Sequence, residues 1–319
     1  MRSFLVWSLA VRSFASNLRY GCDRVTVERS PLPPALPLTV GVIAISFASI
    51  FIEWSNSPAS VIGMYRLAFT VVLFVPFVFR YKRAILQIAW RDWMLLALSG
   101  AFLGLHFLFW IESLKRTTVA SSMILMSLQP AFAMAGAYFV LAQRPDRRGL
   151  WSLLLALVGT AIVSGGDLGK SNAVVIGDML SLLGAAAIAA SRLIGQVLSA
   201  RTPAYVYNVS VFFFAALVLC AYNLGFSIPM AGYPWRDWGI FALLALVPTV
   251  FGHALFNWLL KWVNAVTISM AILGEPIGAI ALAYLLLGQT VRGYQVVGGA
   301  VTLFGVFLFL KNRQLLVRR

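Results

Sequence analysis

Long apolar runs separated by short polar turns dominate the chain. Because an α-helix of about 20 apolar residues crosses the hydrocarbon core of a bilayer, runs of this length predict membrane-spanning helices. The predicted spans are 37–54, 58–79, 92–112, 118–140, 147–165, 177–199, 204–224, 238–260, 264–287 and 293–311. The pattern therefore predicts an all-α membrane protein with ten transmembrane helices.

Composition supports the membrane interpretation. Hydrophobic residues make up 61% of the chain and charged residues only 11%, whereas a soluble domain carries about 25% charged residues. The net charge of +15 is spread between the apolar runs and does not gather on one surface, which excludes nucleic acid as an expected partner. Membrane lipids are the expected surroundings.

Positive charge also predicts orientation. If the N-terminus is cytoplasmic, the inner segments hold 18 Lys and Arg residues and the outer loops hold five. Cytoplasmic loops carry the excess of positive charge, so both termini are predicted in the cytoplasm and the protein in the cytoplasmic (inner) membrane. The two remaining basic residues, Arg66 and Arg192, fall within spans.

The tetrapeptide WRDW occurs at Trp90–Trp93 and again at Trp235–Trp238. Other landmarks recur at nearly the same interval: LQP against GEP, Gln143 against Gln289, and Gly159 against Gly305. The chain therefore divides into two halves of five spans each. Because five is odd, the second half enters the membrane inverted. We predict five-helix repeats at 37–165 and 173–311, between a cytoplasmic N-terminal tail with a Pro-rich linker at 1–36 and a basic cytoplasmic tail at 312–319.

The two WRDW segments would mark the same corner of two inverted units. Trp suits the headgroup level of the membrane, and the charged pair is expected to face water. The small-residue stripe of Ala187, Ser191 and Gly195, like the glycines of the last span, allows close helix approach. The sequence leaves open whether these stripes pack inside one chain or form a homodimer.

Two stretches carry a family resemblance, LHFLFWIESLKRTTVASSMILMSLQPAFAMAGAYFVLAQRP and FGHALFNWLLKWVNAVTISMAILGEPIGAIALAYLLLGQ, with MYRLAFT in the second span. They resemble the EamA-like family of the drug/metabolite transporter superfamily. The resemblance implies a ten-helix carrier of two inverted repeats that moves small metabolites or amino-acid-like solutes, usually outward. The family usually has Glu near the ends of the fourth and ninth spans, where this chain has Gln143 and Gln289.

Polar residues at bilayer depth need a physical reason, because a charge there costs at least about 2.5 to 3.5 kcal/mol on insertion scales. Glu275 lies mid-span, and the following Pro276 removes a helix hydrogen bond. Gln129 and Pro130 hold the same place in the first half. Inverted halves would bring both interruptions to one central cavity. Glu275 is then the candidate for proton or cation coupling, and the alternative is a structural carboxyl that locks helices together. For Gln129 the alternative to lining the cavity is a simple interhelical hydrogen bond.

Arg66 lies too deep to reach either surface and must face the interior. Its predicted partner is the carboxylate of either Glu275 or a substrate, which a guanidinium grips at two points. His253, Asn257 and Lys261 recur every four residues on one helical face, as His106 and Trp110 do in the first half. No third ligand stands at metal-binding spacing near the histidines. No cofactor or metal is expected, and cavity lining or packing remain alternatives for these side chains.

The sequence thus predicts a secondary transporter, an exporter of small solutes that works by alternating access around a midplane cavity. The candidate substrate-binding residues are Arg66, His106, Trp110, Gln129, His253, Asn257 and Glu275. An intramembrane enzyme using His106, His253, Glu112 and Glu275 is the rival hypothesis, although no catalytic motif places these residues. A non-transporting scaffold is a third.

Overall fold

The computed structural model describes residues 31–141, 147–167 and 171–312, and the described residues contain no β-strand. The first half contains α2 (Ala35–Ser46), α3 (Ala48–Glu53), α4 (Ala59–Phe74), η1 (Val75–Tyr81), α5 (Lys82–Leu86), α6 (Trp90–Leu114), α7 (Val119–Met126), α8 (Gln129–Leu141) and α9 (Arg147–Asp167). The second half contains α10 (Asn172–Leu198), α11 (Ala204–Gly225), α12 (Trp235–Leu244), η2 (Ala245–Ala254), α13 (Leu255–Leu259), α14 (Ala265–Ala271), η3 (Ile272–Gly274), α15 (Glu275–Leu287) and α16 (Gly293–Asn312). The predicted N-terminal tail up to residue 30, residues 313–319 and Gln143 lie outside the described residues.

Several of these helices join end to end into longer rods. Eight stretches in the described part of the chain are long and apolar enough to cross a membrane, and each overlaps one predicted span. Helices α9 and α16 occupy the fifth and tenth predicted spans and stand outside that count. The chain is a multi-pass α-helical membrane protein, and the inverted ten-span arrangement stays a prediction.

The prolines interrupt the rods where the sequence indicates. The break between α7 and α8 directly precedes Gln129 and Pro130, and the 3₁₀ turn η3 directly precedes Glu275 and Pro276. A proline has no N–H to continue the helical ladder, so the backbone tightens or breaks before it. Gln129 and Glu275 therefore begin new helices at matching places in the two halves.

A third interruption was not predicted. Pro248 lies inside η2, which has the wider π-helical winding. Proline leaves the carbonyl four residues before it without its helical donor, and the hydroxyl of Thr249 donates to that carbonyl, at Leu244, over 2.7 Å. This bond satisfies the freed group, so a π segment can persist in the middle of a buried rod.

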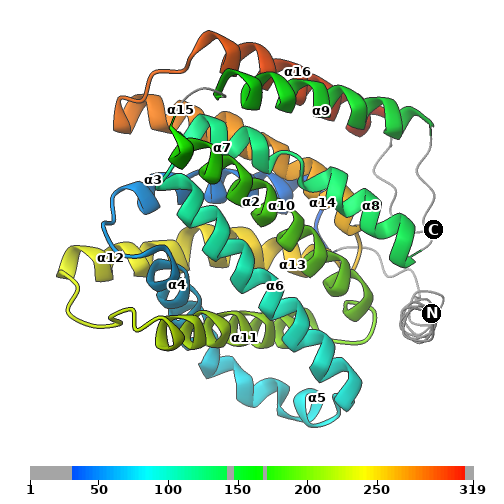
Figure 1. Ribbon diagram of the computed structural model, residues 1–319. Coiled ribbons are helices and arrows are strands. Elements are labelled where there is room, and N and C mark those ends of the chain that lie inside the picture. Colours follow the sequence, from blue (N-terminus) through cyan, green and yellow to red (C-terminus); the bar gives the residue numbers. More distant parts are fainter. Residues whose placement is uncertain (1–30, 142–146, 168–170, 313–319) are drawn as a thin grey trace, which may run out of the picture.

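Close helix crossings follow the small residues. Helices α9 and α16 lie side by side (Figure 1). A Cβ at Gly159 would clash with the backbone of Thr302, and one at Gly305 would lie 2.8 Å from the nitrogen of Ala156. These contacts are reciprocal, because Gly305 lies 146 residues after Gly159 and Thr302 lies 146 residues after Ala156. The glycines therefore mark a crossing that relates one half to the other.

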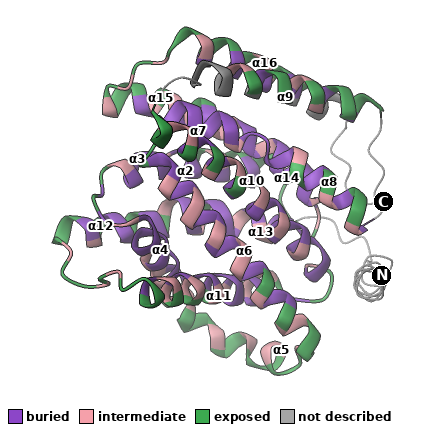
Figure 2. Cartoon of the chain, viewed as in Figure 1, coloured by how far each residue is buried: buried purple, intermediate pink, exposed green. Residues whose placement is uncertain are grey.

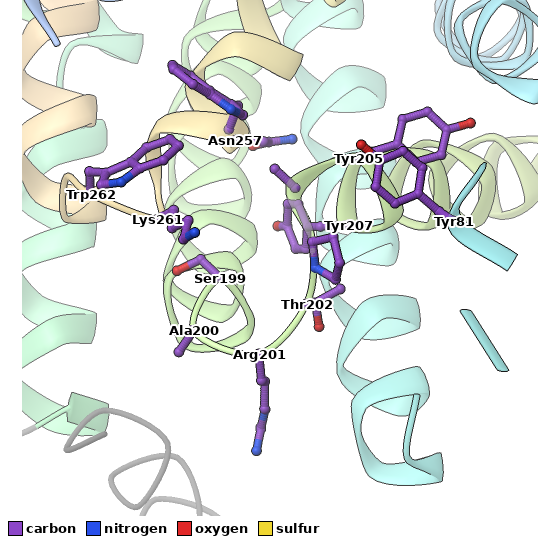
Figure 3. Close-up of a pocket in the computed structure, with 13 residues that line it drawn as sticks. Tyr81, Ser199, Ala200, Arg201, Thr202, Tyr205, Tyr207, Asn257, Lys261 and Trp262 are labelled. Atoms are coloured by element: carbon purple, nitrogen blue, oxygen red, sulfur yellow. The ribbon is translucent and has the colours of Figure 1, made fainter. Parts of the chain in front are cut away.

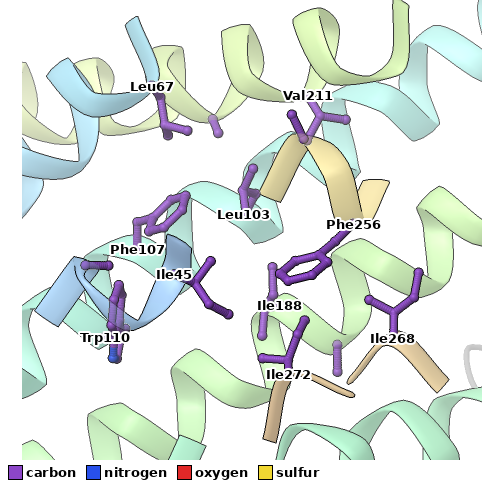
Figure 4. Packing of buried hydrophobic residues seen from close by; sticks show 14 of the residues in the cluster. Ile45, Leu67, Leu103, Phe107, Trp110, Ile188, Val211, Phe256, Ile268 and Ile272 are labelled. Atoms are coloured by element: carbon purple, nitrogen blue, oxygen red, sulfur yellow. The ribbon is translucent and has the colours of Figure 1, made fainter. Parts of the chain in front are cut away.

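The small-residue stripe on α10 faces inward, toward α6. Ser99 on α6 donates to the carbonyl of Ser191 over 3.1 Å, and a side chain at Gly195 would clash with the hydroxyl of Tyr207. The stripe therefore serves packing within the chain. Around it lies the apolar core, in which Phe107, Ile188 and Phe256 are among the side chains drawn in Figure 4.

The outer surface is apolar as well. Figure 2 shows much of α9 and α16 exposed, and Trp151 and Phe304 there are 71% and 55% exposed. Soluble proteins rarely present large continuous apolar patches to water. An apolar exterior around polar interior groups is the arrangement that a lipid solvent favours.

Each WRDW segment begins a helix, and its Asp reaches into the other half of the chain. Asp92, in the first turn of α6, pairs with Arg201 at 3.0 Å, and Asp237, in the first turn of α12, accepts a hydrogen bond from Ser57 at 2.9 Å. The expectation that these charged groups face water holds for the exposed Arg91 and Arg236 but was wrong for Asp237, which is only 6% exposed. Because Asp237 is buried and accepts a hydrogen bond from the opposite half, this segment forms a contact between the two halves as well as a membrane-interface anchor.

Candidate functional site

A small cavity lies where helices of both halves converge. It is lined by Ile45, Ala48, His106, Trp110, Met123, Met126, Gln129, Ile188, Arg192, His253, Ile272 and Glu275. We call it the central cavity. Its volume of about 20 Å³ holds roughly one water molecule. In this structure the cavity therefore has no room for a larger solute.

Glu275 is the acidic side chain of the central cavity. The chain carries it there because α15 begins at Glu275, directly after the 3₁₀ turn. Within the described part of the chain, its carboxylate forms no ion pair within 4 Å and accepts no hydrogen bond, and its accessible surface leaves it only partly buried. Its backbone carbonyl accepts a hydrogen bond from Ser46 at 3.4 Å. The carboxylate is thus held in place without a bound partner.

Arg192 supplies a positive charge to the same cavity, from α10. It is 3% exposed, its guanidinium lies 5.8 Å from the ring centroid of Phe256, and its Nη1 has no hydrogen-bond partner among the described residues. Sequence reasoning noted Arg192 within a span but assigned it no role. The signal that singled out Arg66, a charge at bilayer depth, applied equally to Arg192.

Arg66 lies beside the central cavity and does not line it. It is fully buried on α4, donates from Nε to the hydroxyl of Thr249 at 2.6 Å, and places its guanidinium 4.3 Å from the ring centroid of Phe107. Among the described residues, Nη1 and Nη2 find no partner, and no ion pair with Glu275 forms within 4 Å. The Phe107 ring in turn packs against His253, a residue of the cavity wall, at 5.2 Å between centroids.

The histidines and Trp110 form one aromatic wall. His106 stacks on Trp110 at 5.9 Å with nearly parallel rings, and His106 and His253 lie 6.2 Å apart between centroids. The Nδ1 of His106 lies 3.0 Å from the carbonyl of Gly184, and because a carbonyl only accepts, Nδ1 carries the proton. The neutral ring then keeps Nε2 as an acceptor. No group of three possible metal ligands occurs in the part of the chain that the structure describes.

Gln129 joins the two interrupted rods across the cavity. It is 4% exposed, and its Nε2 donates to the hydroxyl of Ser269 on α14 at 2.8 Å. The interhelical bond that the sequence offered as an alternative is therefore present. Gln129 still lines the cavity, so both descriptions apply to it.

Asn257 lines a different cavity, of about 460 Å³, which we call the second cavity (Figure 3). Its Nδ2 donates to Asn208 at 2.8 Å, and Lys261 and Tyr207 lie on the same cavity. Four residues of helix rise about 6 Å, so side chains on one face meet different depths. The four-residue spacing therefore predicted one helical face for His253 and Asn257, but the two residues do not line the same cavity.

The structure also separates the residues of the rival enzyme hypothesis. Glu112 lies at the surface end of α6, where its Oε1 accepts from Nη2 of Arg116 at 2.6 Å with the side chain 34% exposed. It does not line the central cavity with His106, His253 and Glu275. The four residues therefore do not form one site.

Comparisons with known proteins match the part of the chain that contains the central cavity. The model of the EamA-like transporter family matches the chain twice, over residues 35–165 and 175–311. The chain is similar to a protein of Salmonella typhimurium named probable amino-acid metabolite efflux pump, with 23% identity over 195 residues that cover 58% of this chain and 65% of the relative. The match thus spans less than two thirds of the relative's length.

The fold is similar to one solved by crystallography, with a TM-score of 0.66 over 88% of this chain and 96% of the other. Sequence identity between the two is 15%, so the likeness is one of fold alone.

Proposed function

The chain belongs to the EamA-like transporter family, and we propose that it is a secondary transporter that exports small amino-acid-like metabolites by alternating access. The observation that carries the proposal is the central cavity, where Arg192 and Glu275 face one enclosed space without pairing. Export of amino-acid metabolites also agrees with the name of the Salmonella relative.

Charged groups without partners do little to hold helices together. Burying an unpaired charge costs several kcal/mol, and a protein selected for stability alone would close such a pair or replace it with apolar side chains. Groups left open toward a cavity keep their binding capacity for a solute. Their place beside the interruption at Pro276 matches the interrupted-helix sites of carriers, which lie near the bilayer midplane.

A polar line leads toward this site. Lys261 and Asn257 line the second cavity, and His253, one turn deeper on the same rod, lines the central cavity. The predicted orientation puts Lys261 at the cytoplasmic side. We therefore assign the second cavity as the cytoplasmic approach of a solute on its way out.

Alternating access needs contacts that close opposite faces in turn. The Asp92–Arg201 pair and the Ser57–Asp237 hydrogen bond are reciprocal contacts between the halves, and in the predicted inverted topology they lie on opposite sides of the membrane. We assign the first as the cytoplasmic latch and the second as the outer latch. A carrier could open one while the other holds.

Glu275 is the proposed coupling group. Its carboxylate is the acidic side chain that lines the central cavity, so a proton or cation bound there would interact directly with the solute. The proposal includes both termini in the cytoplasm, the inner membrane as location, and repeats at 37–165 and 173–311. A homodimer remains compatible with the apolar outer surface.

The function is tested with the purified full-length protein. A thermal-stabilisation screen against amino acids, nucleosides and organic cations identifies solutes, and flux of the best solute is then measured in liposomes. We expect an amino acid to stabilise the protein and to be transported, and Glu275→Gln to reduce its flux. Glu112→Gln, the same change at an exposed surface pair, is the matched control. Absence of binding and flux for every amino acid would refute the proposal.

A further inference from the structure

The central cavity presents one basic and one acidic side chain that form no ion pair within 4 Å in the described structure. Arg192 is buried with Nη1 unpartnered in the described structure, and the Glu275 carboxylate forms no ion pair within 4 Å there. Opposite charges at the wall of one small cavity attract strongly at low dielectric. Something therefore holds them apart.

The helix packing supplies that restraint. Arg192 is held on α10 beside the ring of Phe256, and Glu275 is held at the start of α15, where Pro276 stiffens the backbone and Ser46 binds the backbone carbonyl. The side chains come from different helices whose positions are set by the core. The two side chains therefore line one cavity from separate helices without forming an ion pair within 4 Å.

We propose that Arg192 and Glu275 are the two anchors for a zwitterion, a solute that carries a carboxylate and an ammonium group close together. This inference rests on the proposed function and specifies its substrate. The guanidinium of Arg192 donates two parallel N–H bonds to the carboxylate. The Glu275 carboxylate accepts N–H bonds from the ammonium group, and both charges of the solute are then satisfied.

The rest of the wall selects the side chain of the solute. Met123, Met126, Ile188 and Ile272 line the cavity together with the ring of Trp110. Thioethers and aliphatic groups adapt to apolar shapes of different size. His106, Gln129 and His253 complete the wall, so a third charge on the solute would find hydrogen-bonding groups but no second acidic or guanidinium side chain, and its burial is costly. The site therefore selects amino acids with apolar side chains over acidic or basic ones.

Arg66 has a different part. Its Nε is bound to Thr249, its guanidinium packs on Phe107, and it does not line the cavity, so it does not touch the solute in this conformation. Its charge adds a positive field around the site. Arg192, which sequence reasoning left without a role, is the residue that grips the carboxylate.

The test uses L-leucine and three probes that share its side chain: isopentylamine, 4-methylpentanoate and N-acetyl-leucine. Isopentylamine lacks the carboxylate, 4-methylpentanoate lacks the ammonium group, and the acetyl group removes the ammonium charge. Binding of each to the purified full-length protein is measured by calorimetry. We expect leucine to bind at least about tenfold more tightly than any other probe, because a charged hydrogen bond lost from a buried site weakens binding about 10- to 100-fold.

Two variants assign the anchors. In Arg192→Met the preference for leucine over isopentylamine should disappear, while the preference over 4-methylpentanoate should persist. In Glu275→Gln the pattern should be the reverse. A purely structural role would weaken all probes alike. Arg192→Lys should keep the order of preference with weaker binding, and Arg116→Met and Glu112→Gln, at the exposed pair, should leave every affinity unchanged.

The outcomes separate the two proposals. If wild-type protein binds isopentylamine or 4-methylpentanoate as tightly as leucine, the zwitterion site is refuted without any variant, even where flux shows a working transporter. Equal loss for all probes in folded Arg192→Met also refutes it. If the wild-type protein neither binds nor moves any amino acid, the proposed function fails as well.

Discussion

Ser57→Ala should shift the carrier toward its outward-open state. The Ser57 hydroxyl donates to Asp237 at 2.9 Å, and the two residues are 2% and 6% exposed. A buried hydrogen bond to a charged group contributes about 1.5 to 3 kcal/mol. If water solvates both groups in the open state, losing the bond favours that state about 10-fold or more.

The cytoplasmic latch should be weaker. The side chains of Arg201 and Asp92 are 41% and 13% exposed. An ion pair that is this accessible to water contributes about 0.2 to 1 kcal/mol. Arg201→Gln should therefore favour the inward-open state by no more than about fivefold. Because the outer latch is the stronger one, the resting carrier should open more readily toward the cytoplasm.

Labelling of a cavity cysteine measures both effects. Met123→Cys, at a cavity-lining position that is 2% exposed, is made in a background with Cys22→Ser and Cys220→Ser. A membrane-impermeant maleimide is then added to the outer or the cytoplasmic side of oriented vesicles. Ser57→Ala should raise the labelling rate from the outer side about 10-fold or more, and Arg201→Gln should raise it modestly from the cytoplasmic side.

The matched control is Ser49→Ala, which removes a buried hydroxyl on α3 that has no hydrogen-bond partner among the described residues. It should leave both labelling rates unchanged. Outer-side labelling of Ser57→Ala within twofold of wild type would contradict the latch assignment. An increase from the cytoplasmic side alone would reverse it.

Three further predictions address packing, coupling and topology. Gly159→Ala should lower the unfolding temperature, because its Cβ would clash with backbone at Thr302 and overpacking costs about 1 to 3 kcal/mol; Gly239→Ala on α12, with open space around its Cβ, should not. Glu275→Gln should abolish the pH dependence of flux between about pH 5 and 8, and a pH profile identical to wild type would leave Glu275 a structural role. Reporter fusions after residues 168 and 315 should lie outside and in the cytoplasm respectively, and finding both on one side would refute the inverted repeat.

The interior arginines show how far sequence reasoning reaches. A charge inside an apolar run predicts an inward-facing side chain for Arg66 and Arg192 alike. Which of them borders the cavity depends on the rotation of α4 and α10 about their axes. Phe107 lies over the guanidinium of Arg66, and a contact between α4 and α6 leaves no periodic signal in the sequence.

The histidine stripe shows the same limit in another direction. Spacing predicted one helical face for His253 and Asn257, but the two residues line separate cavities. Periodicity describes rotation about a helix axis and carries no information on where neighbouring helices leave space. The π winding around Pro248 adds a further offset that spacing rules for regular helices omit.

The sequence by itself determined the membrane solvent, the helical spans, the interruptions before Pro130 and Pro276, and the family resemblance. These properties depend on local free energies, namely the transfer of apolar side chains into lipid and the missing N–H of proline. Only the tertiary structure decided that Arg192 and Glu275 line the same cavity, and that Asp92 and Asp237 each reach into the opposite half. Transfer into lipid is equally favourable for every apolar helix face. Which helices pack together is therefore decided by close packing of small residues and by polar contacts between distant segments.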